Sequence, residues 1–280
     1  MKKILVAGSK GFIGSALKKK LEDLNFQITE FKGDVSVSQS YKDIVNKTFS
    51  HCFHLAAKTF VPDSWSNSAE FIKTNVIGTE RILNYCSGKK ISLTYLSAYL
   101  YGIPERLPIS ETHPLKPNNP YALSKYLAEN LCRYYSVKHK LKVTVFRPFN
   151  VYGPNQDKKF LIPSVIEQVL NSKNTISVKD IAPKRDYIYI DDLIEAMILS
   201  MNNNKRYAVY NIASGTSISV KKVIDVIQKA AKTNKKIKSE GINRTNEIPD
   251  TIANINLAKQ ELQWNPKYTF EKGILEVLQT

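Results

Sequence analysis

Along the first half of this chain, short apolar runs of strand length alternate with segments whose apolar residues have helical spacing. Residues 4–7 form a short β-branched and apolar run, and residues 12–24 then carry apolar side chains at helical spacing. Further apolar runs of strand length occur at 27–31, 52–57, 92–97 and 142–147. Helical patterns separate them at 41–47, 68–87 and 120–138. This alternation predicts an α/β fold, a doubly wound parallel sheet with helices on both faces and a ligand at the carboxyl ends of its strands.

This alternation of strand and helix patterns ends after Gly153 and Pro154. A helix is predicted at 161–170, an irregular lysine-rich stretch follows, and a helix at 191–201 precedes a strand at 207–213. The final third is mostly helical, with no repeat or long linker, which indicates a smaller lobe rather than a second large domain.

We therefore expect two units in the folded chain. Residues 1–153, joined by 188–213, form the sheet domain, and residues 154–187 with 214–280 form a smaller, mainly helical C-terminal substrate lobe. The lobe would cover the ligand edge of the sheet, so that a substrate of about the size of a sugar binds between the two units.

Three glycines stand between the first strand and the first helix. Gly8, Gly11 and Gly14 have the spacing GxxGxxG. Glycine lets the backbone turn sharply and lets a pyrophosphate approach the N–H groups at a helix N-terminus. A plain tight turn has the same local pattern, but the position after the first strand favours dinucleotide binding by the sheet domain.

Tyr121 and Lys125 lie four residues apart in the helical stretch 120–138. Residues at this spacing share one face of a helix, and an ammonium beside a phenol stabilises the phenolate. Lowering a tyrosine pKa from ~10 to ~7 takes about 4 kcal/mol, which a desolvated neighbouring charge supplies. The pair is a candidate acid/base group, although an ordinary amphipathic helix also carries such pairs.

Composition narrows the classes of partner. Hydrophobic residues make up 42% of the chain and charged residues 24%, and no apolar run approaches the ~20 residues of a membrane span. The formal charge of +16 favours nucleic acids, acidic membranes or phosphorylated small molecules. Since no nucleic-acid module accompanies the lysines, we expect neither a nucleic acid nor a membrane as partner.

Cysteine and histidine usage gives no sign of metal or disulfide chemistry. Cys52, Cys86 and Cys132 are odd in number and lack CxxC spacing, and the four histidines form no ligand motif. The first apolar run stops after Ala7, too early for a signal peptide. We expect reduced thiols, no metal site and a cytoplasmic protein.

Five motifs occur in a fixed order along the chain. They are Gly8-x-x-Gly11-x-x-Gly14, His54-Leu55-Ala56-Ala57, Ser97 in LSAYLYG, Tyr121-x-x-x-Lys125, and RPFNVYGP at 147–154 followed by RDYIYIDD at 185–192. With these motifs the chain resembles, nearly from end to end, the extended short-chain dehydrogenase/reductases that modify nucleotide-linked sugars. The resemblance implies a Rossmann-like fold, an NAD(P) cofactor and a nucleotide-diphosphate sugar as substrate.

The resemblance also implies roles for three side chains at the reacting carbon. Tyr121 acts as acid/base on a sugar hydroxyl or carbonyl, Lys125 holds the nicotinamide ribose and lowers the tyrosine pKa, and Ser97 hydrogen-bonds the same oxygen. A hydride moving to or from C4 leaves charge on that oxygen, which two donors placed there stabilise.

Further residues match positions that contact the cofactor or the substrate in this family. The expected cofactor-binding residues besides Tyr121 and Lys125 are Gly8, Lys10, Gly11, Phe12, Ile13, Gly14, Lys32, Asp34, Leu55, Ala56 and Ala57. The expected substrate-binding residues are Ser64, Ser97, Asn150 and Arg185, of which Asn150 and Arg185 would meet the diphosphate. His54 and Arg147 are expected to serve the fold.

Two positions depart from the family pattern. The dehydratases of the family carry an Asp-Glu pair directly after the residue equivalent to Ser97, whereas this chain has Ala98 and Tyr99, which argues against dehydration. NAD-preferring members place an Asp at the end of the second strand, where this chain has Phe31-Lys32. Lys32 and Lys10 favour the 2′-phosphate of NADP(H), although NAD is still possible because both lysines also fit a solvated surface.

Three functions fit these residues. The first is an NADPH-dependent 4-ketoreductase of a nucleotide-linked 4-keto-6-deoxyhexose. The second is an NAD-dependent nucleotide-sugar 4-epimerase, which uses the same side chains. The third is a non-catalytic nucleotide-binding regulatory protein, against which the intact Ser97, Tyr121 and Lys125 set argues. A homodimer is expected in each of the enzymatic cases.

Overall fold

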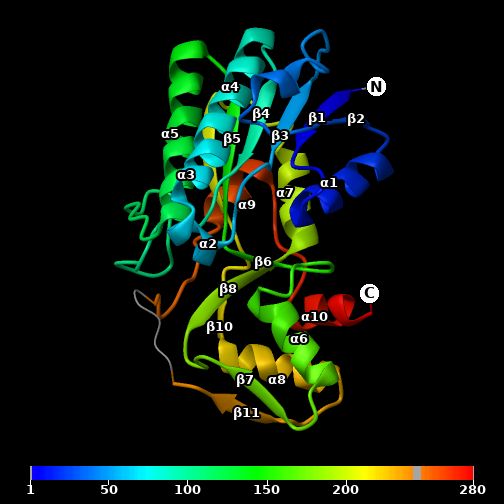
Figure 1. Cartoon of the computed structure of the whole chain (residues 1–280), viewed down its shortest axis with the longest axis vertical. Coiled ribbons are helices and arrows are strands. Elements are labelled where there is room, and N and C mark those ends of the chain that lie inside the picture. The colour runs from blue at the N-terminus through cyan, green and yellow to red at the C-terminus, as the bar shows by residue number, and fades with distance from the viewer. Residues whose placement is uncertain (1, 242–246, 280) are drawn as a thin grey trace.

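Six parallel strands form the central sheet, in the order β2-β1-β3-β4-β5-β9. They are β1 (Lys3–Ala7), β2 (Gln27–Glu30), β3 (His51–His54), β4 (Ser92–Leu96), β5 (Val143–Pro148) and β9 (Tyr207–Ile212). The computed structural model describes residues 2–241 and 247–279. It confirms the expected parallel sheet with helices on both faces, and it places a second, smaller lobe below the sheet in the view of Figure 1.

The helices cover the two faces of this sheet in different sets. They are α1 (Phe12–Asp23) and α7 (Ile190–Ser200) on one face, and α4 (Gly78–Lys89) and α5 (Pro120–His139) on the other. In β1, Ile4 and Val6 pack with the α1 face, whereas Leu5 and Ala7 pack with the α4 face. Because both faces are covered, the strand is apolar at every one of these positions instead of alternating.

The helical pattern expected at 68–87 is a single run with a change of pitch. It consists of α3 (Ser68–Phe71), the π-helical segment η2 (Ile72–Ile77) and α4. The helix expected at 41–47 is wrong. The 3₁₀ segment η1 (Ser38–Tyr41) is followed by turns, because the N–H groups of Lys42, Ile44 and Lys47 donate to carbonyls three residues earlier rather than four.

The smaller lobe combines helices with two short sheets. Its helices are α6 (Leu161–Asn171), α8 (Val220–Ala230) and α10 (Phe270–Leu278). Its strands are β6 (Asn150–Tyr152), β8 (Lys184–Tyr189) and β10 (Ser217–Ser219) in one sheet, and β7 (Thr175–Val178) and β11 (Lys236–Ser239) in the other. The irregular stretch expected after residue 170 is therefore wrong. Strand β7 has only four residues, so its alternation of buried and more exposed side chains is brief. Ile176 and Val178 are buried, and Thr175 and Ser177 are more exposed.

The C-terminal segment returns to the central sheet before it ends in the lobe. Helix α9 (Asn256–Leu262) packs on β9 and α7, and the Trp264 indole N–H donates to the Asp192 carbonyl at 2.9 Å. Residues 214–280 thus do not all lie in the lobe to which the sequence pattern assigns them. We propose a division in which 253–264 joins the sheet domain; residues 1, 242–246 and 280 lie outside the described part of the chain.

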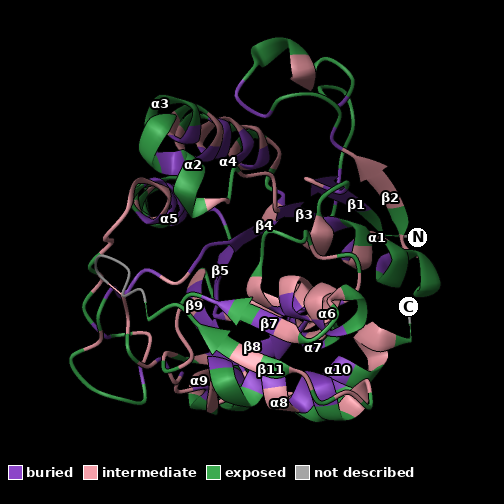
Figure 2. Ribbon diagram, turned by 60° about the horizontal axis from the view of Figure 1, so that its bottom comes forward, coloured by how far each residue is buried: buried purple, intermediate pink, exposed green. Residues whose placement is uncertain are grey.

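Burial follows the same two-unit arrangement (Figure 2). Buried residues concentrate along the strands and on the inward faces of α5, α7 and α8, and exposed residues on their outer turns. Among the described residues, no helix is long and apolar enough to cross a bilayer. The same residues form no group of three or more His, Cys, Asp or Glu side chains that could hold a metal ion.

Candidate active site

The glycine turn packs directly against the segment after β3. Gly8 has φ +89°, and a Cβ on it would lie 2.6 Å from the Ala56 nitrogen. A Cβ on Gly14 would lie 2.0 Å from the Gly8 carbonyl oxygen. Helix α1 then begins at Phe12 with Gly11 as N-cap and no capping side chain, so its first N–H groups face outward without a side-chain acceptor. This is the geometry that receives a pyrophosphate.

An acidic side chain stands at the end of β2, next to this turn. Glu30 is the last residue of the strand, and its carboxylate accepts hydrogen bonds from the Ser9 hydroxyl at 2.6 Å and from Lys18 Nζ at 2.7 Å. Lys18, together with Ser9, lowers the pKa of this carboxyl. The expectation that the strand ends without an acidic residue is wrong, because Phe31 turns inward and is buried.

The other residues expected around the adenosine are exposed or engaged locally. Lys10 and Lys32 are exposed. Asp34 accepts from the Ser36 backbone N–H and hydroxyl, both at 2.8 Å, and these bonds lower its pKa. Their cofactor contacts stay predictions, but the structure brings Glu30 and Lys18 into the same neighbourhood, which sequence spacing did not reveal.

Tyr121 and Lys125 lie on the first turns of α5, at the carboxyl end of β4. The Asn119 side chain caps the helix by accepting from the Ala122 N–H at 2.8 Å. Lys125 is 3% exposed; its Nζ donates to the Leu96 carbonyl at 2.5 Å and lies 4.3 Å from the centre of the Tyr95 ring. The helix thus anchors the lysine beside the residue that precedes Ser97.

Burial controls the protonation of both groups. It lowers the pKa of Lys125 to about 7 and raises the pKa of Tyr121 above its ordinary value. The expectation that Lys125 lowers the tyrosine pKa is not met by this arrangement, because the ammonium is turned to the Leu96 carbonyl and the Tyr95 ring. The phenol therefore holds its proton at neutral pH, as an ordinary tyrosine does, and burial makes it a weaker acid.

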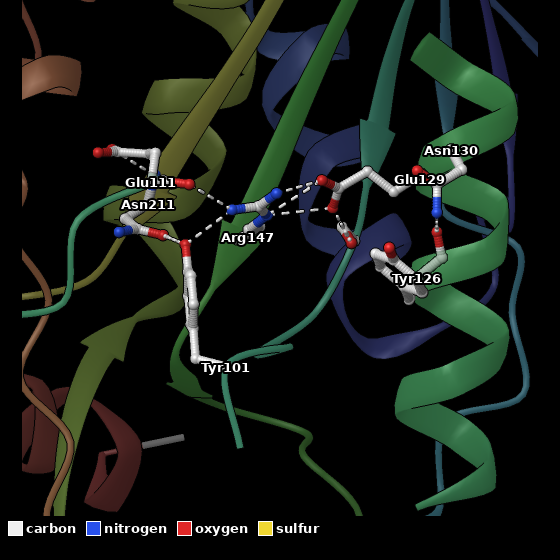
Figure 3. A network of polar contacts seen from close by, with 8 residues as sticks. Tyr101, Glu111, Tyr126, Glu129, Asn130, Arg147 and Asn211 are labelled. Atoms are coloured by element: carbon white, nitrogen blue, oxygen red, sulfur yellow. Dashed lines mark hydrogen bonds and ion pairs between the residues drawn. The ribbon is translucent and has the colours of Figure 1, made fainter. Parts of the chain in front are cut away.

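Ser97 follows β4 and is 3% exposed. Its hydroxyl donates to Glu129 at 2.9 Å, and Glu129 is held by an ion pair with Arg147 of β5 (Figure 3). Sequence reasoning assigned Arg147 to the fold and did not single out Glu129. The available signal was the spacing, since Glu129 stands four residues after Lys125 and eight after Tyr121, on the same face of α5.

The expected substrate-side residues are engaged within the protein. Ser64 is fully buried and donates to the Val61 carbonyl inside α2 (Val61–Ser66) at 2.6 Å. Asn150 donates to the Asp186 carbonyl at 3.2 Å. Arg185 forms an ion pair with Glu247 and donates to the Ile248 carbonyl at 2.5 Å. Asn150 and Arg185 do lie on neighbouring strands, β6 and β8, but their diphosphate contacts stay predictions.

A cavity of about 600 Å³ lies between the two units. It is lined by Phe12, Lys58, Thr59, Phe60, Asp63, Asn67, Glu70, Phe71, Gln156, Asp157, Lys159 and Phe160. Phe12 belongs to the cofactor turn, and the Phe71 ring lies edge-on to the Tyr121 ring, with centroids 6.3 Å apart. The lining also carries three carboxylates, and both lysines are paired within it, Lys58 with Glu70 at 3.5 Å and Lys159 with Asp157 at 3.8 Å. The aromatic walls and the volume fit a ring-bearing molecule of substrate size.

The two positions after Ser97 carry no carboxylate. Ala98 is buried, and the Tyr99 hydroxyl donates to the Gly102 carbonyl at 2.8 Å while its ring packs against Tyr101 and Phe149. These two positions thus do not supply the Asp-Glu pair that the sequence comparison associates with dehydration.

The family model described as GDP-mannose 4,6 dehydratase matches residues 16–277. Among curated proteins, the chain is 26% identical to the GDP-6-deoxy-D-mannose reductase of Pseudomonas aeruginosa, with 99% of this chain and 96% of the relative covered. It is 29% identical to a putative UDP-glucose 4-epimerase of Methanocaldococcus jannaschii, with 98% and 97% covered.

Solved structures give the same picture. The chain is similar to RMD from Pseudomonas aeruginosa complexed with NADPH, at a TM-score of 0.93 and 26% identity, over 100% of this chain and 98% of that one. It is also similar to MoeE5 in complex with UDP-glucuronic acid and NAD, at a TM-score of 0.89 and 25% identity, over 99% and 98%. The chain thus shares its whole fold with one structure that holds NADPH and with one that holds NAD.

Proposed function

The chain belongs to the GDP-mannose 4,6 dehydratase family, an NAD(P)-dependent group within the short-chain dehydrogenase/reductases, and on that premise we propose that it is a nucleotide-sugar 4-ketoreductase. NADP(H) is the favoured cofactor, with NAD possible. The proposed substrate is a nucleotide-linked 4-keto-6-deoxyhexose, and the first candidate for the nucleotide is GDP, after the relatives described above.

One observation carries the choice of reduction within a family named for dehydration. Ser97, Tyr121 and Lys125 are all present, while Ala98 and Tyr99 replace the acid–base pair. Such a site can move a proton to or from one oxygen but cannot remove water across two carbons.

The residues of this chain have separate tasks in the proposed reaction. NADPH supplies a hydride to C4 when it is bound, with its pyrophosphate at the glycine turn. Tyr121 is proposed to donate its proton to the C4 oxygen, where negative charge develops, and Lys125 to hold the nicotinamide ribose. Asn150 and Arg185 are proposed to hold the diphosphate, and the cavity is proposed to receive the sugar.

A second candidate, an NAD-retaining 4-epimerase, is favoured by one observation. Glu30 stands at the end of β2, where a carboxylate accepts hydrogen bonds from the hydroxyls of an adenosine ribose and repels a 2′-phosphate. The reductase and the epimerase use the same side chains. We rank the reductase first because a full-length relative is a GDP-6-deoxy-D-mannose reductase and a similar structure, at a TM-score of 0.93, is complexed with NADPH.

Changing Lys10 and Lys32 together to Ala is expected to weaken NADPH binding about tenfold or more and to leave NADH binding unchanged. Each charge-assisted hydrogen bond to the 2′-phosphate is worth ~1.5–3 kcal/mol before salt screening. Fluorescence titration at low and high salt measures both cofactors. Glu30→Gln is the matched variant, and it should strengthen NADPH relative to NADH. Equal binding of the two cofactors to the unmodified protein at low salt would remove this role of the lysines.

We propose a homodimer that forms through α5. Leu123, Leu127, Tyr134 and Val137 are between 38% and 60% exposed, and their spacing places them on one outer stripe of the helix. An exposed apolar stripe of this kind is typical of a helix that packs against another protein surface, and the surface proposed here is the same helix of a second copy. The protein is proposed to act in the cytoplasm, in keeping with its three buried free cysteines.

Changing Leu127 and Val137 together to Glu is expected to convert the dimer to a monomer, because four carboxylates would then face one another in an apolar contact. Sedimentation velocity at micromolar concentration measures the change. Leu170→Glu on α6, where Leu170 is 57% exposed, is the matched control and should leave the dimer intact. A double variant that still sediments as a dimer would move the interface elsewhere.

The proposed reaction is tested by incubating the protein with NADPH and a panel of nucleotide-linked 4-keto-6-deoxyhexoses, GDP-linked sugars first. Loss of NADPH absorbance in proportion to a sugar product heavier by two hydrogens supports the reductase. An isomer of unchanged mass, formed from a nucleotide hexose without added cofactor, would support the epimerase instead.

A further inference from the structure

A side chain of the sheet domain contacts the lobe across the cavity between the two units. Phe60 is the N-cap residue of α2, whereas Lys159 and Phe160 come directly before α6 in the lobe. The Lys159 Nζ lies 5.2 Å from the centre of the Phe60 ring, and the Phe160 ring meets the Phe60 ring edge-on, with centroids 6.4 Å apart. All three residues line the cavity. They form a clasp that joins its two walls.

The sheet-domain side of the clasp has a fixed base. Two residues before Phe60, the Lys58 backbone N–H donates to the Asn75 side chain at 2.8 Å, and the Asn75 amide donates back to the Lys58 carbonyl at 3.0 Å. Asn75 is buried and also donates to the Ser124 hydroxyl at 2.8 Å. Phe60 therefore extends from a backbone position that is tied to both η2 and α5.

The lobe side of the clasp is a short turn, residues 155–160. Asn155 has φ +63°, a left-handed conformation that Asn tolerates better than most residues. Within the turn, the Lys159 N–H donates to the Asp157 carboxylate at 2.9 Å and the Phe160 N–H donates to the Asp157 carbonyl at 3.0 Å. In the described part of the chain, none of the hydrogen bonds of this turn reaches the sheet domain. The aromatic and cation–π contacts of the clasp therefore tie the turn to the opposite wall.

The cavity also borders the two segments that are expected to hold the cofactor. Phe12 of the glycine turn lines it, and so does Lys58, which directly follows residues 55–57. The backbone of that second segment packs against Gly8 of the glycine turn. A dinucleotide held by these segments lies next to the cavity, so a contact between the cavity walls can control its passage.

We propose that the clasp formed by Phe60, Lys159 and Phe160 is a gate through which the cofactor enters and leaves. The contacts of the clasp join protein to protein and do not involve the cofactor itself, so the same contacts have to open for entry and for exit. Loss of the clasp then raises the association and dissociation rate constants by one factor and leaves the dissociation constant unchanged. A side chain that contacted the cofactor directly would change the dissociation constant.

Stopped-flow fluorescence of NADPH measures both rate constants, association by mixing at several cofactor concentrations and dissociation by chasing with excess NADP⁺. Phe60→Ala is expected to raise both about fivefold to fiftyfold, because it removes one aromatic pair and one cation–π contact. Phe60→Leu, which keeps apolar bulk without the ring, should act in the same direction and serves if the Ala variant does not fold. Lys158→Ala is the matched control, since this lysine of the same turn pairs with Glu167 and not with Phe60, and it should change neither rate constant.

Two results of this experiment would overturn the gate. Rate constants that stay as in the unmodified protein would show that the cofactor passes elsewhere. A faster dissociation with unchanged association, and so a weaker dissociation constant, would make Phe60 a cofactor contact instead. Absence of NADPH and NADH binding to the unmodified protein would also end the proposal.

A double-mutant cycle tests whether the two walls act together. Lys159→Met combined with Phe160→Ala removes both lobe-side partners and should raise the two rate constants as Phe60→Ala does. Added to Phe60→Ala, the same pair should have little further effect, because its contacts are already lost. Fold changes that multiply would show that the two sides act independently and would contradict the clasp.

The inference concerns cofactor exchange and does not rest on the proposed reaction. If both rate constants rise together but no nucleotide sugar is turned over, the gate stands and the proposed function fails. If a nucleotide-linked 4-keto sugar is reduced but the rate constants of the Phe60 variants are unchanged, the gate fails and the proposed function stands.

Discussion

Replacing Tyr121 with Phe is expected to lower kcat by about 10² to 10⁴ while cofactor affinity stays within about twofold. The ring and its edge-on contact with Phe71 are kept, and only the proton carrier is lost. Burial raises the pKa of this phenol, so the unmodified enzyme enters the reaction with the proton in place. Removing it leaves the developing charge on the C4 oxygen without its donor.

Steady-state kinetics and a cofactor titration on the same preparation separate the two effects. Tyr134→Phe is the matched control, since Tyr134 lies on the same helix and is 53% exposed. That variant should behave as the unmodified protein. Turnover of Tyr121→Phe within a few-fold of the unmodified enzyme would show that another group donates the proton.

Replacing Lys125 with Met is expected to lower both turnover and cofactor affinity, because the lysine is proposed to hold the nicotinamide ribose and so to place the transferred hydride. A loss of ~10² or more in kcat/KM is expected for a buried charged donor whose partners are left unpaired. Kinetics with a cofactor titration again measure the change. A turnover loss with unaltered cofactor affinity would remove the ribose role.

The same lysine makes stability depend on pH in a way that the Met variant should lose. Its pKa is about 7 in the folded protein, against an ordinary value of 10.5. Between these values the unfolded chain binds the proton that the folded chain has released, so unfolding free energy rises with pH, by at most about 1.4 kcal/mol per unit. Below pH 7 the full cost of burying the charge is present.

Denaturant unfolding of both proteins at pH 7 and pH 9, without cofactor, measures this effect. The unmodified protein should gain stability relative to Lys125→Met between the two values. Parallel behaviour of the two proteins over this range would mean that Lys125 stays charged in the folded state.

Local chemistry explains which parts of the site the sequence revealed. The glycine turn and the Tyr121–Lys125 pair depend on spacings of three or four residues, and the turn is tight because its glycines touch the Ala56 backbone and each other. The strands of the central sheet could also be predicted from local sequence. Burial on both faces makes them continuously apolar.

Contacts between distant segments explain what the sequence did not reveal. Glu129 and Arg147 are far from Ser97 along the chain, and only the pairing of β4 with β5 beneath α5 brings them together. Glu30 was missed because the strand end was placed one residue too late. The raised pKa of Tyr121 comes from its burial, a tertiary property that the four-residue spacing to Lys125 does not reveal.

The central claim, that this chain reduces a nucleotide-linked 4-keto sugar, is tested most directly with NADPH carrying deuterium at the transferred position. The account predicts one deuterium in each sugar product and one oxidised cofactor for each product formed. Sugar isomers that form without deuterium and without net NADPH consumption would contradict it.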